Sequence, residues 1–371
     1  MFSRIRGQSR VINILQKALQ LDKIANSYLF HGPDGVGKFT TALYFGMALN
    51  CQSEIDTKPC GICSSCRKFL NFTHPDFVFI FPSPNLDVSP EGEVKSDKLL
   101  NEYQDYIKNK IETPWKEFIF SSKVEIRISS IRMLEHKINL TPNEAKYKVY
   151  IVEDAESMNI NTANAFLKTL EEPPQDALII LTSANPNSLL PTILSRCQKI
   201  TFQALPRDII EKELIENRFL ENIEAKLYAR IANGSMEKAL RLVDSSSIES
   251  RENALELIKI ILDHDDLRFI EYASEFRSVK SQTKLAEIIS HLIIWTSDLT
   301  YLKIAPTEIV NLDNTEMLEK MYLKNPAVEN YVYDLIEYME KTLKLLVGNI
   351  NPQLVLTSIY HKYTGKLAGG T

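Results

Sequence analysis

The stretch Ser27-Tyr-Leu-Phe-His-Gly32-Pro-Asp-Gly-Val-Gly37-Lys38 decides the fold of the N-terminal half of this chain. Its first five residues form an apolar run that predicts a buried strand, and a helical pattern follows over 40–50. Glycines let backbone N–H groups wrap around a phosphate, and the start of a helix adds partial positive charge there. The stretch therefore predicts a phosphate-binding loop whose lysine reaches the terminal phosphates. The alternative is a glycine-rich turn without a ligand.

Working outward, two further runs have the composition of central parallel strands. Residues 148–152 (KVYIV) and 177–182 (ALIILT) are apolar and rich in β-branched residues, as expected for strands covered on both faces. Between them lies a helical segment that ends at Pro173 and Pro174. Strand, helix and strand in this order predict right-handed crossovers and a doubly wound parallel α/β sheet flanked by helices.

Two positions of the predicted nucleotide site depart from the pattern of a hydrolysing enzyme. The motif requires Ser or Thr after the lysine, because that hydroxyl binds Mg²⁺, and this chain has Phe39. Thr40 does not simply replace it, since the next helical residue points about 100° away. The strand 148–152 is followed by Glu153 and Asp154, where Asp followed by Glu is usual. Efficient hydrolysis is therefore not expected, while weak binding of ATP with Mg²⁺ is left open. The residues assigned to the nucleotide site are Gly32, Gly35, Val36, Gly37, Lys38, Phe39, Thr40, Glu153 and Asp154.

Four of the five cysteines lie within 16 residues, with the spacing C-x8-C-x2-C-x2-C. In a reducing compartment, such clustering favours a metal over disulfides. Four thiolates suit one tetrahedral Zn²⁺, and a four-sulfur site leaves no open position, so the zinc is expected to be structural. The predicted ligands are Cys51, Cys60, Cys63 and Cys66. The alternative is four unligated buried cysteines.

A length of 371 residues predicts two or three domains, and 44% hydrophobic with 25% charged residues is typical of soluble globular protein. We expect an α/β domain over 1–205, with the cysteine module at 51–66 and a polar insertion at about 82–123. A small helical domain (206–247) and an all-helical domain (248–371) follow. The net charge of −5 argues against bulk phosphate neutralisation. No apolar run is long enough to span a membrane and no signal peptide is visible, so a cytoplasmic protein is expected.

Five stretches together resemble the bacterial clamp loaders of DNA polymerase III, within the AAA+ ATPases. They are the opening Gly7-Gln8 with the phosphate loop, the cysteine insertion, Leu167-Lys-Thr-Leu-Glu-Glu-Pro-Pro174, Leu194-Ser-Arg-Cys197 and Asn349-Ile-Asn-Pro-Gln-Leu-Val-Leu356. The resemblance implies an AAA+ P-loop domain with a zinc insertion, a helical lid domain and a C-terminal collar that oligomerises. It also implies a ring with gamma/tau and delta subunits that acts on a sliding clamp and primed DNA.

The departures from the motifs favour one kind of subunit. Gamma/tau subunits carry a sensor arginine where this chain has Glu237 within Gly234-Ser-Met-Glu237, and a carboxylate there is adverse to ATP. Arg196 is kept, which resembles delta-prime, the subunit that completes the site of a neighbour. An arginine supplied in trans stabilises the charge that develops on the γ-phosphate, for which a planar guanidinium is suited. Arg196 is therefore the expected catalytic residue, acting in trans.

Two alternatives to this delta-prime-like stator, a largely non-hydrolysing subunit, remain open. The chain could be a gamma/tau-like subunit that binds and hydrolyses ATP itself, with Thr40 and Glu153 as tolerated substitutes. It could also be a different P-loop enzyme that shares only the phosphate loop, which the LKTLEEPP and SRC stretches and the cysteines disfavour. For Arg196 itself, the alternative to a residue acting in trans is a surface arginine paired with a carboxylate.

Overall fold

The computed structural model of the protein describes residues 2–368, except 55–56, 86–95, 117, 119, 244–245, 279–280 and 347–349. Residues 55–56 of the cysteine module, residues 86–95, 117 and 119 of the predicted insertion, and Asn349 of the last quoted stretch therefore lie outside the described residues. The chain forms two compact units. One contains the residues up to Ile210 together with Ala232–Lys238, and the other contains Glu211–Ile231 and the residues from Ala239 onward. The predicted boundaries after 205 and 247 stay a prediction.

The first unit is built on a five-stranded, fully parallel sheet in the order β2-β3-β4-β1-β5. The strands are β1 (Ser27–His31), β2 (Phe77–Ile80), β3 (Lys148–Val152), β4 (Ala177–Ser183) and β5 (Gln198–Thr201). Both runs predicted as central strands, together with 27–31, are confirmed as strands. β3, β4 and β1 are adjacent in the sheet, which is why their residues are apolar on both faces.

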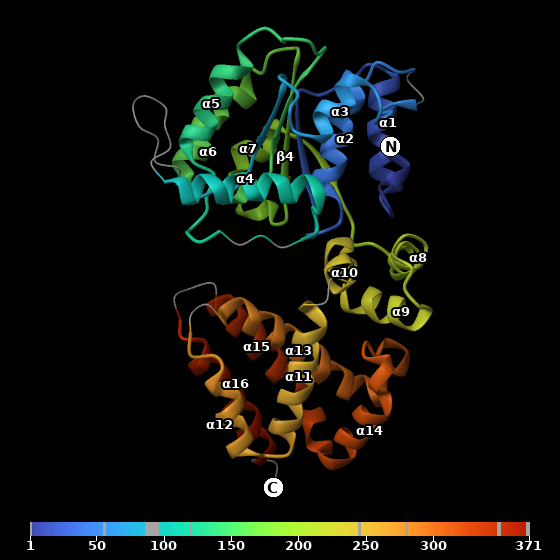
Figure 1. Cartoon of the computed structure of the whole chain (residues 1–371), viewed down its shortest axis with the longest axis vertical. Helices are drawn as coiled ribbons and strands as arrows, with labels where there is room; N and C mark the ends of the chain where they lie inside the picture. The colour runs from blue at the N-terminus through green and yellow to red at the C-terminus, as the bar shows by residue number, and fades with distance from the viewer. Residues whose placement is uncertain are drawn as a thin grey trace. The chain divides into compact units, whose positions relative to one another are not determined.

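Helices cover both faces of this sheet, as Figure 1 shows on either side of β4. The helices are α1 (Ser9–Gln20), α2 (Lys38–Asn50), α3 (Ser64–Leu70), α4 (Asp97–Glu112), α5 (Ile128–Ile138), α6 (Ile160–Glu171) and α7 (Pro191–Arg196). Alternate residues of β4 face opposite layers: Leu178 and Ile180 join the core with α1–α3, whereas Ile179 and Leu181 join the core with α5–α7. The predicted parallel α/β sheet with flanking helices is confirmed.

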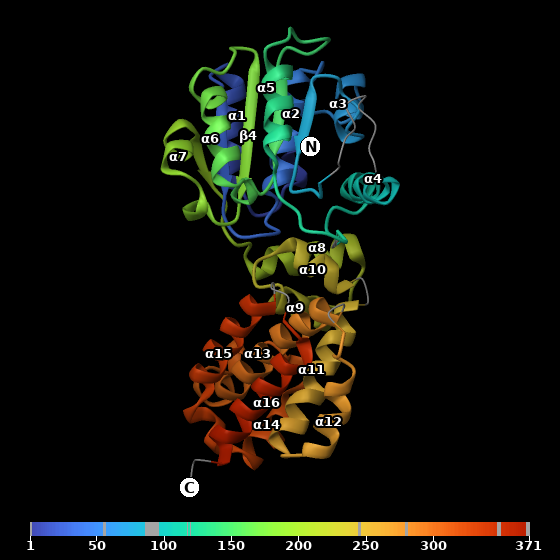
Figure 2. The ribbon, with the colours of Figure 1, turned by 90° about the vertical axis from the view of Figure 1, so that its left-hand side faces the viewer.

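Parallel strands place all their carboxyl ends at one edge of a sheet, where ligands bind in open α/β folds. The phosphate loop follows β1, and Glu153 and Asp154 follow β3, so both lie at that edge. Helix α4 of the predicted insertion lies near the same edge, as the view in Figure 2 shows. The fold therefore brings together three segments that are far apart in the sequence.

From residue 206 onward the described residues contain helices and no strand, in agreement with the loss of strand signal in the sequence. The helices are α8 (Arg207–Arg218), α9 (Asn222–Ile231), α10 (Met236–Val243), α11 (Ser246–Leu262), α12 (Asp266–Ser274), α13 (Gln282–Ile304), α14 (Thr315–Lys324), α15 (Val332–Leu346) and α16 (Pro352–Ala368). The core of the second unit surrounds α13, where Trp295 is 1% exposed. The C-terminal region is thus helical, with its own hydrophobic core.

Candidate functional site

The phosphate loop has the backbone shape that its glycines predict. Gly35 and Gly37 have φ values of 73° and 93°, which side chains with a β-carbon rarely adopt. Lys38 is buried, and its Nζ donates hydrogen bonds to the carbonyl oxygens of Gly32 (2.7 Å) and Pro33 (2.8 Å). Val36 is also buried. With Asp34 Oδ1 at 3.4 Å as well, the lysine ammonium has all these partners within the loop itself.

Phe39 makes a hydrophobic contact at the position where a Mg²⁺-binding hydroxyl is needed. Its ring packs on those of Phe79 (4.9 Å between centroids) and Phe72 (6.0 Å). Thr40 follows it on α2 and is half-buried. The hydroxyl of Thr41 donates to the carbonyl oxygen of Gly37 at 2.7 Å, so it is used within the helix. The first turn of α2 is thus organised by aromatic packing and backbone hydrogen bonds.

Glu153, at the end of β3, is held by two side chains of α4. Lys110 Nζ lies 2.6 Å from Glu153 Oε1, and the Tyr106 hydroxyl donates to Glu153 Oε2 at 3.1 Å. The next residue, Asp154, has a positive φ of 49°, and burial, with Glu153 and Glu156 nearby, raises the pKa of its carboxyl to about 7. Neighbouring residues of this chain thus hold the carboxylate of Glu153 in place and raise the pKa of Asp154.

Sequence reasoning missed Tyr106 and Lys110. They lie more than 40 residues from Glu153 along the chain. The insertion is amphipathic and rich in charge, and residues four apart share a helix face, so a shared face for this pair was predictable. No local pattern indicates which strand end such a face covers.

The segment with Glu237 packs directly on the phosphate loop. The backbone N–H of Glu237 donates to the carbonyl oxygen of Gly35 at 3.2 Å. A β-carbon at Gly35 would lie 2.0 Å from Ser235 Oγ and 2.7 Å from the β-carbon of Glu237. The loop and this segment thus touch without room for a side chain, and the backbone and β-carbon of residue 237 lie directly beside the loop.

Arg196 ends α7 with its side chain about one third exposed and paired within the chain. Its Nη2 lies 2.5 Å from Glu171 Oε1, and its Nη1 donates to the carbonyl oxygen of Thr192 at 2.9 Å. Glu171 is itself about half exposed. An exposed ion pair of this kind contributes little stability, at most about 1 kcal/mol, so it leaves the guanidinium free to exchange partners.

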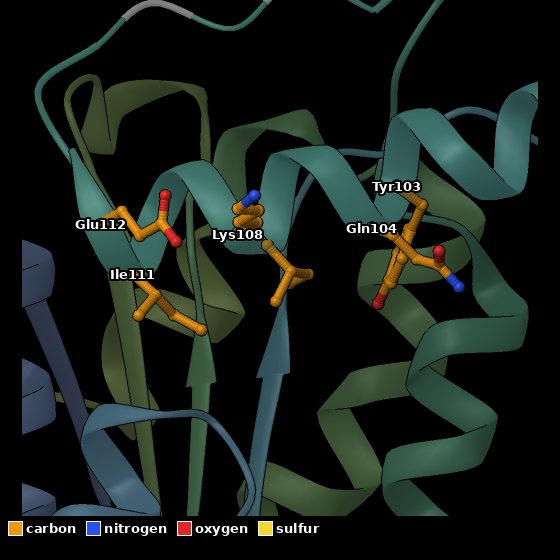
Figure 3. Close-up of a pocket in the computed structure, with 6 residues that line it drawn as sticks. Tyr103, Gln104, Lys108, Ile111 and Glu112 are labelled. Atoms are coloured by element: carbon orange, nitrogen blue, oxygen red, sulfur yellow. The ribbon is translucent and has the colours of Figure 1, made fainter.

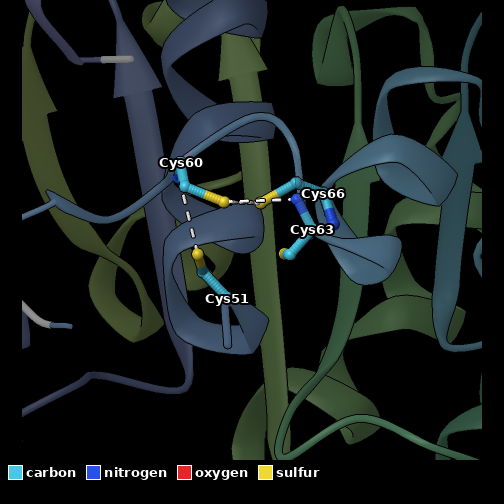
Figure 4. Close-up of side chains that lie close together, drawn as sticks. All are labelled: Cys51, Cys60, Cys63 and Cys66. Atoms are coloured by element: carbon cyan, nitrogen blue, oxygen red, sulfur yellow. Dashed lines mark hydrogen bonds between the residues drawn. The ribbon is translucent and has the colours of Figure 1, made fainter. Parts of the chain in front are cut away.

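The four predicted metal ligands converge in space. They are Cys51, Cys60, Cys63 and Cys66, and their Sγ atoms all lie within 4.8 Å of one another. Figure 4 shows the four side chains facing one another from the end of α2, the following loop and α3. Backbone N–H groups of Ile62 (3.4 Å) and Cys63 (3.3 Å) point at Cys60 Sγ. The Ser53 hydroxyl first, and then these two N–H groups, lower the pKa of Cys60 to about 5. The donor set fits a tetrahedral ion such as Zn²⁺.

Cys197 takes no part in this cluster. It is buried after α7, and burial raises the pKa of its thiol to about 12, so it behaves as a small hydrophobe.

Among the helices of the described residues, none combines the length and the hydropathy that crossing a membrane requires.

Comparisons with known proteins identify relatives of the chain. The family described as DNA polymerase III, delta subunit, matches residues 7–206. DNA polymerase III subunit tau of Bacillus subtilis is 26% identical, over 95% of this chain and 59% of its own length. Subunit delta-prime of the same organism is 29% identical, over 68% of this chain and 65% of its own length. Subunit delta-prime of Pseudomonas aeruginosa is 30% identical, over 64% of this chain and 62% of its own length. The chain therefore covers less than two thirds of each relative.

Proposed function

Because the chain belongs to the DNA polymerase III, delta subunit, family, we propose that it is a delta-prime-like subunit of the clamp loader. In this role it does not hydrolyse ATP efficiently but completes the site of a neighbouring ATPase subunit with Arg196. Its partners are gamma/tau and delta subunits in a hetero-oligomeric ring in the cytoplasm. Through that ring it helps load the sliding clamp onto primed DNA as part of the polymerase III holoenzyme.

One observation carries the choice of a non-hydrolysing subunit. The Mg²⁺-binding hydroxyl is replaced by the packed ring of Phe39, and both oxygens of Glu153 are held by α4. Hydrolysis needs a metal on the β- and γ-phosphates and a group that orients the attacking water. Neither residue supports these steps in this arrangement. Glu237, whose backbone contacts the loop at Gly35, also adds a negative charge near the place where polyphosphate would bind.

The second candidate is a gamma/tau-like subunit that hydrolyses ATP itself. It is favoured by the similarity to subunit tau, which extends over 95% of this chain. In that case Lys38 would leave its loop carbonyls for the terminal phosphates, and Glu153 would exchange Lys110 for a water or metal. The two candidates make opposite statements about ATP turnover by the isolated chain.

The test combines the isolated chain with a reconstituted loader. We expect the isolated chain to show no turnover above that of its Lys38→Ala variant. In the loader, Arg196→Ala should leave assembly intact but strongly reduce hydrolysis at the one interface served and slow clamp loading onto primed DNA. A trans arginine contributes about 10³–10⁵ in rate, although other interfaces keep total turnover higher. Arg196→Lys should not rescue the loss, because the guanidinium fork is required.

Turnover by the isolated chain that Lys38→Ala abolishes would support the gamma/tau-like candidate. If a loader with Arg196→Ala assembles and loads clamps at the wild-type rate, Arg196 is only a surface residue paired with Glu171, and the role in trans is wrong.

A further inference from the structure

A continuous series of aromatic rings connects helix α4 to Phe39, in the first turn of α2 directly after the phosphate loop. The ring of Phe39 contacts that of Phe79 (4.9 Å between centroids), and Phe79 stacks on Phe81 (5.0 Å). Phe81 in turn stacks on Tyr106 of α4 (4.3 Å) and contacts Tyr103 (5.1 Å). The residue that replaces the Mg²⁺-binding hydroxyl is thus part of the surface that holds the insertion.

The charges of α4 meet the same site. Lys110 Nζ lies 2.6 Å from Glu153 Oε1 and 4.5 Å from the centre of the Phe39 ring. Only 15% of the Lys110 side chain and 11% of the Glu153 side chain are exposed, so this is a largely dehydrated pair. With the Tyr106 hydroxyl on Oε2, both carboxylate oxygens have donors. A cation therefore already sits between residues 39 and 153, the two positions that serve a nucleotide-bound metal in a working P-loop enzyme.

We infer that α4 is a built-in lid of this nucleotide site, with Lys110 and Tyr106 occupying the metal-facing side of the pocket and keeping ATP out. The inference rests on the proposed function, because it gives a reason why a subunit with a P-loop does not hydrolyse ATP efficiently. It adds that ATP and α4 are mutually exclusive: polyphosphate with Mg²⁺ enters only when α4 leaves Glu153.

The attachment of α4 to the domain buries little of the helix. None of the residues of α4 is buried to the extent of a core residue. The surface of α4 carries a shallow apolar groove, shown in Figure 3, whose lining consists of Tyr103, Gln104, Ile107, Lys108, Ile111 and Glu112. Lys108 is exposed there, whereas Lys110 is largely buried against Glu153. The two lysines lie on one helix, and they differ in whether they touch the site.

This difference provides a matched pair of variants in the full-length chain. Lys110→Met keeps an apolar stem over Phe39 but removes the charge, and Tyr106→Phe removes only the hydroxyl. These two substitutions are combined in one variant, and Lys108→Met is the control. Two quantities are measured for each: the affinity for radiolabelled ATP with Mg²⁺ by equilibrium dialysis, and hydrogen exchange of the peptide covering 97–112. All three substitutions are conservative in volume, and exchange in β3 and β4 checks that the domain remains folded.

The expected change in ATP affinity is opposite to the change that the loss of a positive charge alone predicts. Removing a cation near a polyphosphate should weaken binding, but Lys110→Met with Tyr106→Phe should bind ATP at least tenfold more tightly than the wild type. Exchange in 97–112 should also be at least tenfold faster, and Mg²⁺-ATP should accelerate it further. Lys108→Met should match the wild type in both measurements.

Equal or weaker ATP binding by the Lys110→Met and Tyr106→Phe variant would overturn the inference, whatever its exchange rate. Wild-type chain that binds ATP while 97–112 keeps its protection would also overturn it. Neither result touches the stator role, which fails separately if the isolated chain turns over ATP.

Discussion

At the scale of single residues, burial decides what a charged side chain contributes, as two neighbouring lysines illustrate. Lys148 is 3% exposed at the start of β3. Its Nζ donates hydrogen bonds to backbone carbonyl oxygens at the end of α5, those of Lys137, Ile138 and Leu140. Carbonyl groups at a helix C-terminus have no partner within the helix, and a cation there also complements the helix dipole. Lys146, in contrast, makes an exposed pair with Asp22.

We therefore predict that Lys148→Met lowers the free energy of unfolding by about 2–3 kcal/mol, because a charged donor and its buried acceptors are separated. Lys146→Met should change it by no more than about 0.5 kcal/mol, as expected for an exposed ion pair. Urea titration of the two variants against the wild type measures both values. Equal effects of the two substitutions would mean that the carbonyl contacts of Lys148 contribute no net stability.

Residue patterns in the sequence predicted those features that depend on near neighbours. Gly35 and Gly37 are needed where they stand because the loop backbone requires positive φ, and four closely spaced cysteines can converge through one turn. The partners of Arg196 and Glu153 were not predictable in the same way. Glu171 is 25 residues from Arg196, and Lys110 is 43 residues from Glu153. Such pairs depend on how the sheet brings strand ends and helices together.

At the scale of elements, the cysteine cluster links α2 to α3. Cys51 directly follows α2, and Cys66 lies within α3 and is fully buried. Cys63 caps α3, where its Sγ accepts from the backbone N–H of Cys66 at 3.5 Å. A bound ion would thus fix the start of α3 against the end of the helix that carries the phosphate loop. Metal binding and local folding are then coupled.

We predict one Zn²⁺ per chain in protein purified without added metal, measured by elemental analysis. Cys63→Ser should lose most of it and lower the melting temperature, since four thiolates define the site. Cys197→Ser, which changes a buried cysteine outside the cluster, should keep the full zinc content. A chain without zinc, or a Cys63→Ser variant with unchanged content, would show that the cluster is a reduced, unligated core.

The strands and helices that carry strong apolar periodicity were predictable, including β1, β3 and β4. The place of α4 was not, because its sequence is polar and none of its residues is buried like a core residue. Its position follows from a few aromatic contacts and one ion pair, which propensity does not encode.

At the scale of the whole molecule, the two compact units have separate hydrophobic cores, and a buried histidine in the second core makes stability depend on pH. In the second unit, His291 is 6% exposed on α13, and burial, with Arg251 nearby, lowers its pKa from 6.5 to about 4. Between these values the unfolded chain binds a proton that the folded unit does not. The free energy of unfolding therefore falls as the pH decreases from about 7 to 4.

We predict that this group alone costs at most about 3 kcal/mol of stability at pH 4, at 1.36 kcal/mol for each unit of pKa shift. His291→Gln should flatten the pH dependence of unfolding of the full chain between pH 7 and 4, whatever its effect at neutral pH. His264→Gln, at an exposed position, should leave the slope unchanged. A His291→Gln variant with the wild-type slope would assign acid sensitivity to other groups.

The close packing of residues 235–237 on Gly35 has a consequence for the evolution of such chains. A β-carbon at position 35 would lie 2.0 Å from the Ser235 hydroxyl oxygen even with no nucleotide present, and the φ of 73° disfavours any other residue. Selection for a stable fold is therefore sufficient to retain this glycine even in a lineage that loses ATP binding. In such a lineage a glycine-rich loop persists as an inherited architectural part. A search for the glycine motif would then assign ATPase activity to chains that lack it. The residue at position 39 would distinguish ATP-hydrolysing chains from chains that only retain the loop better than the glycines do.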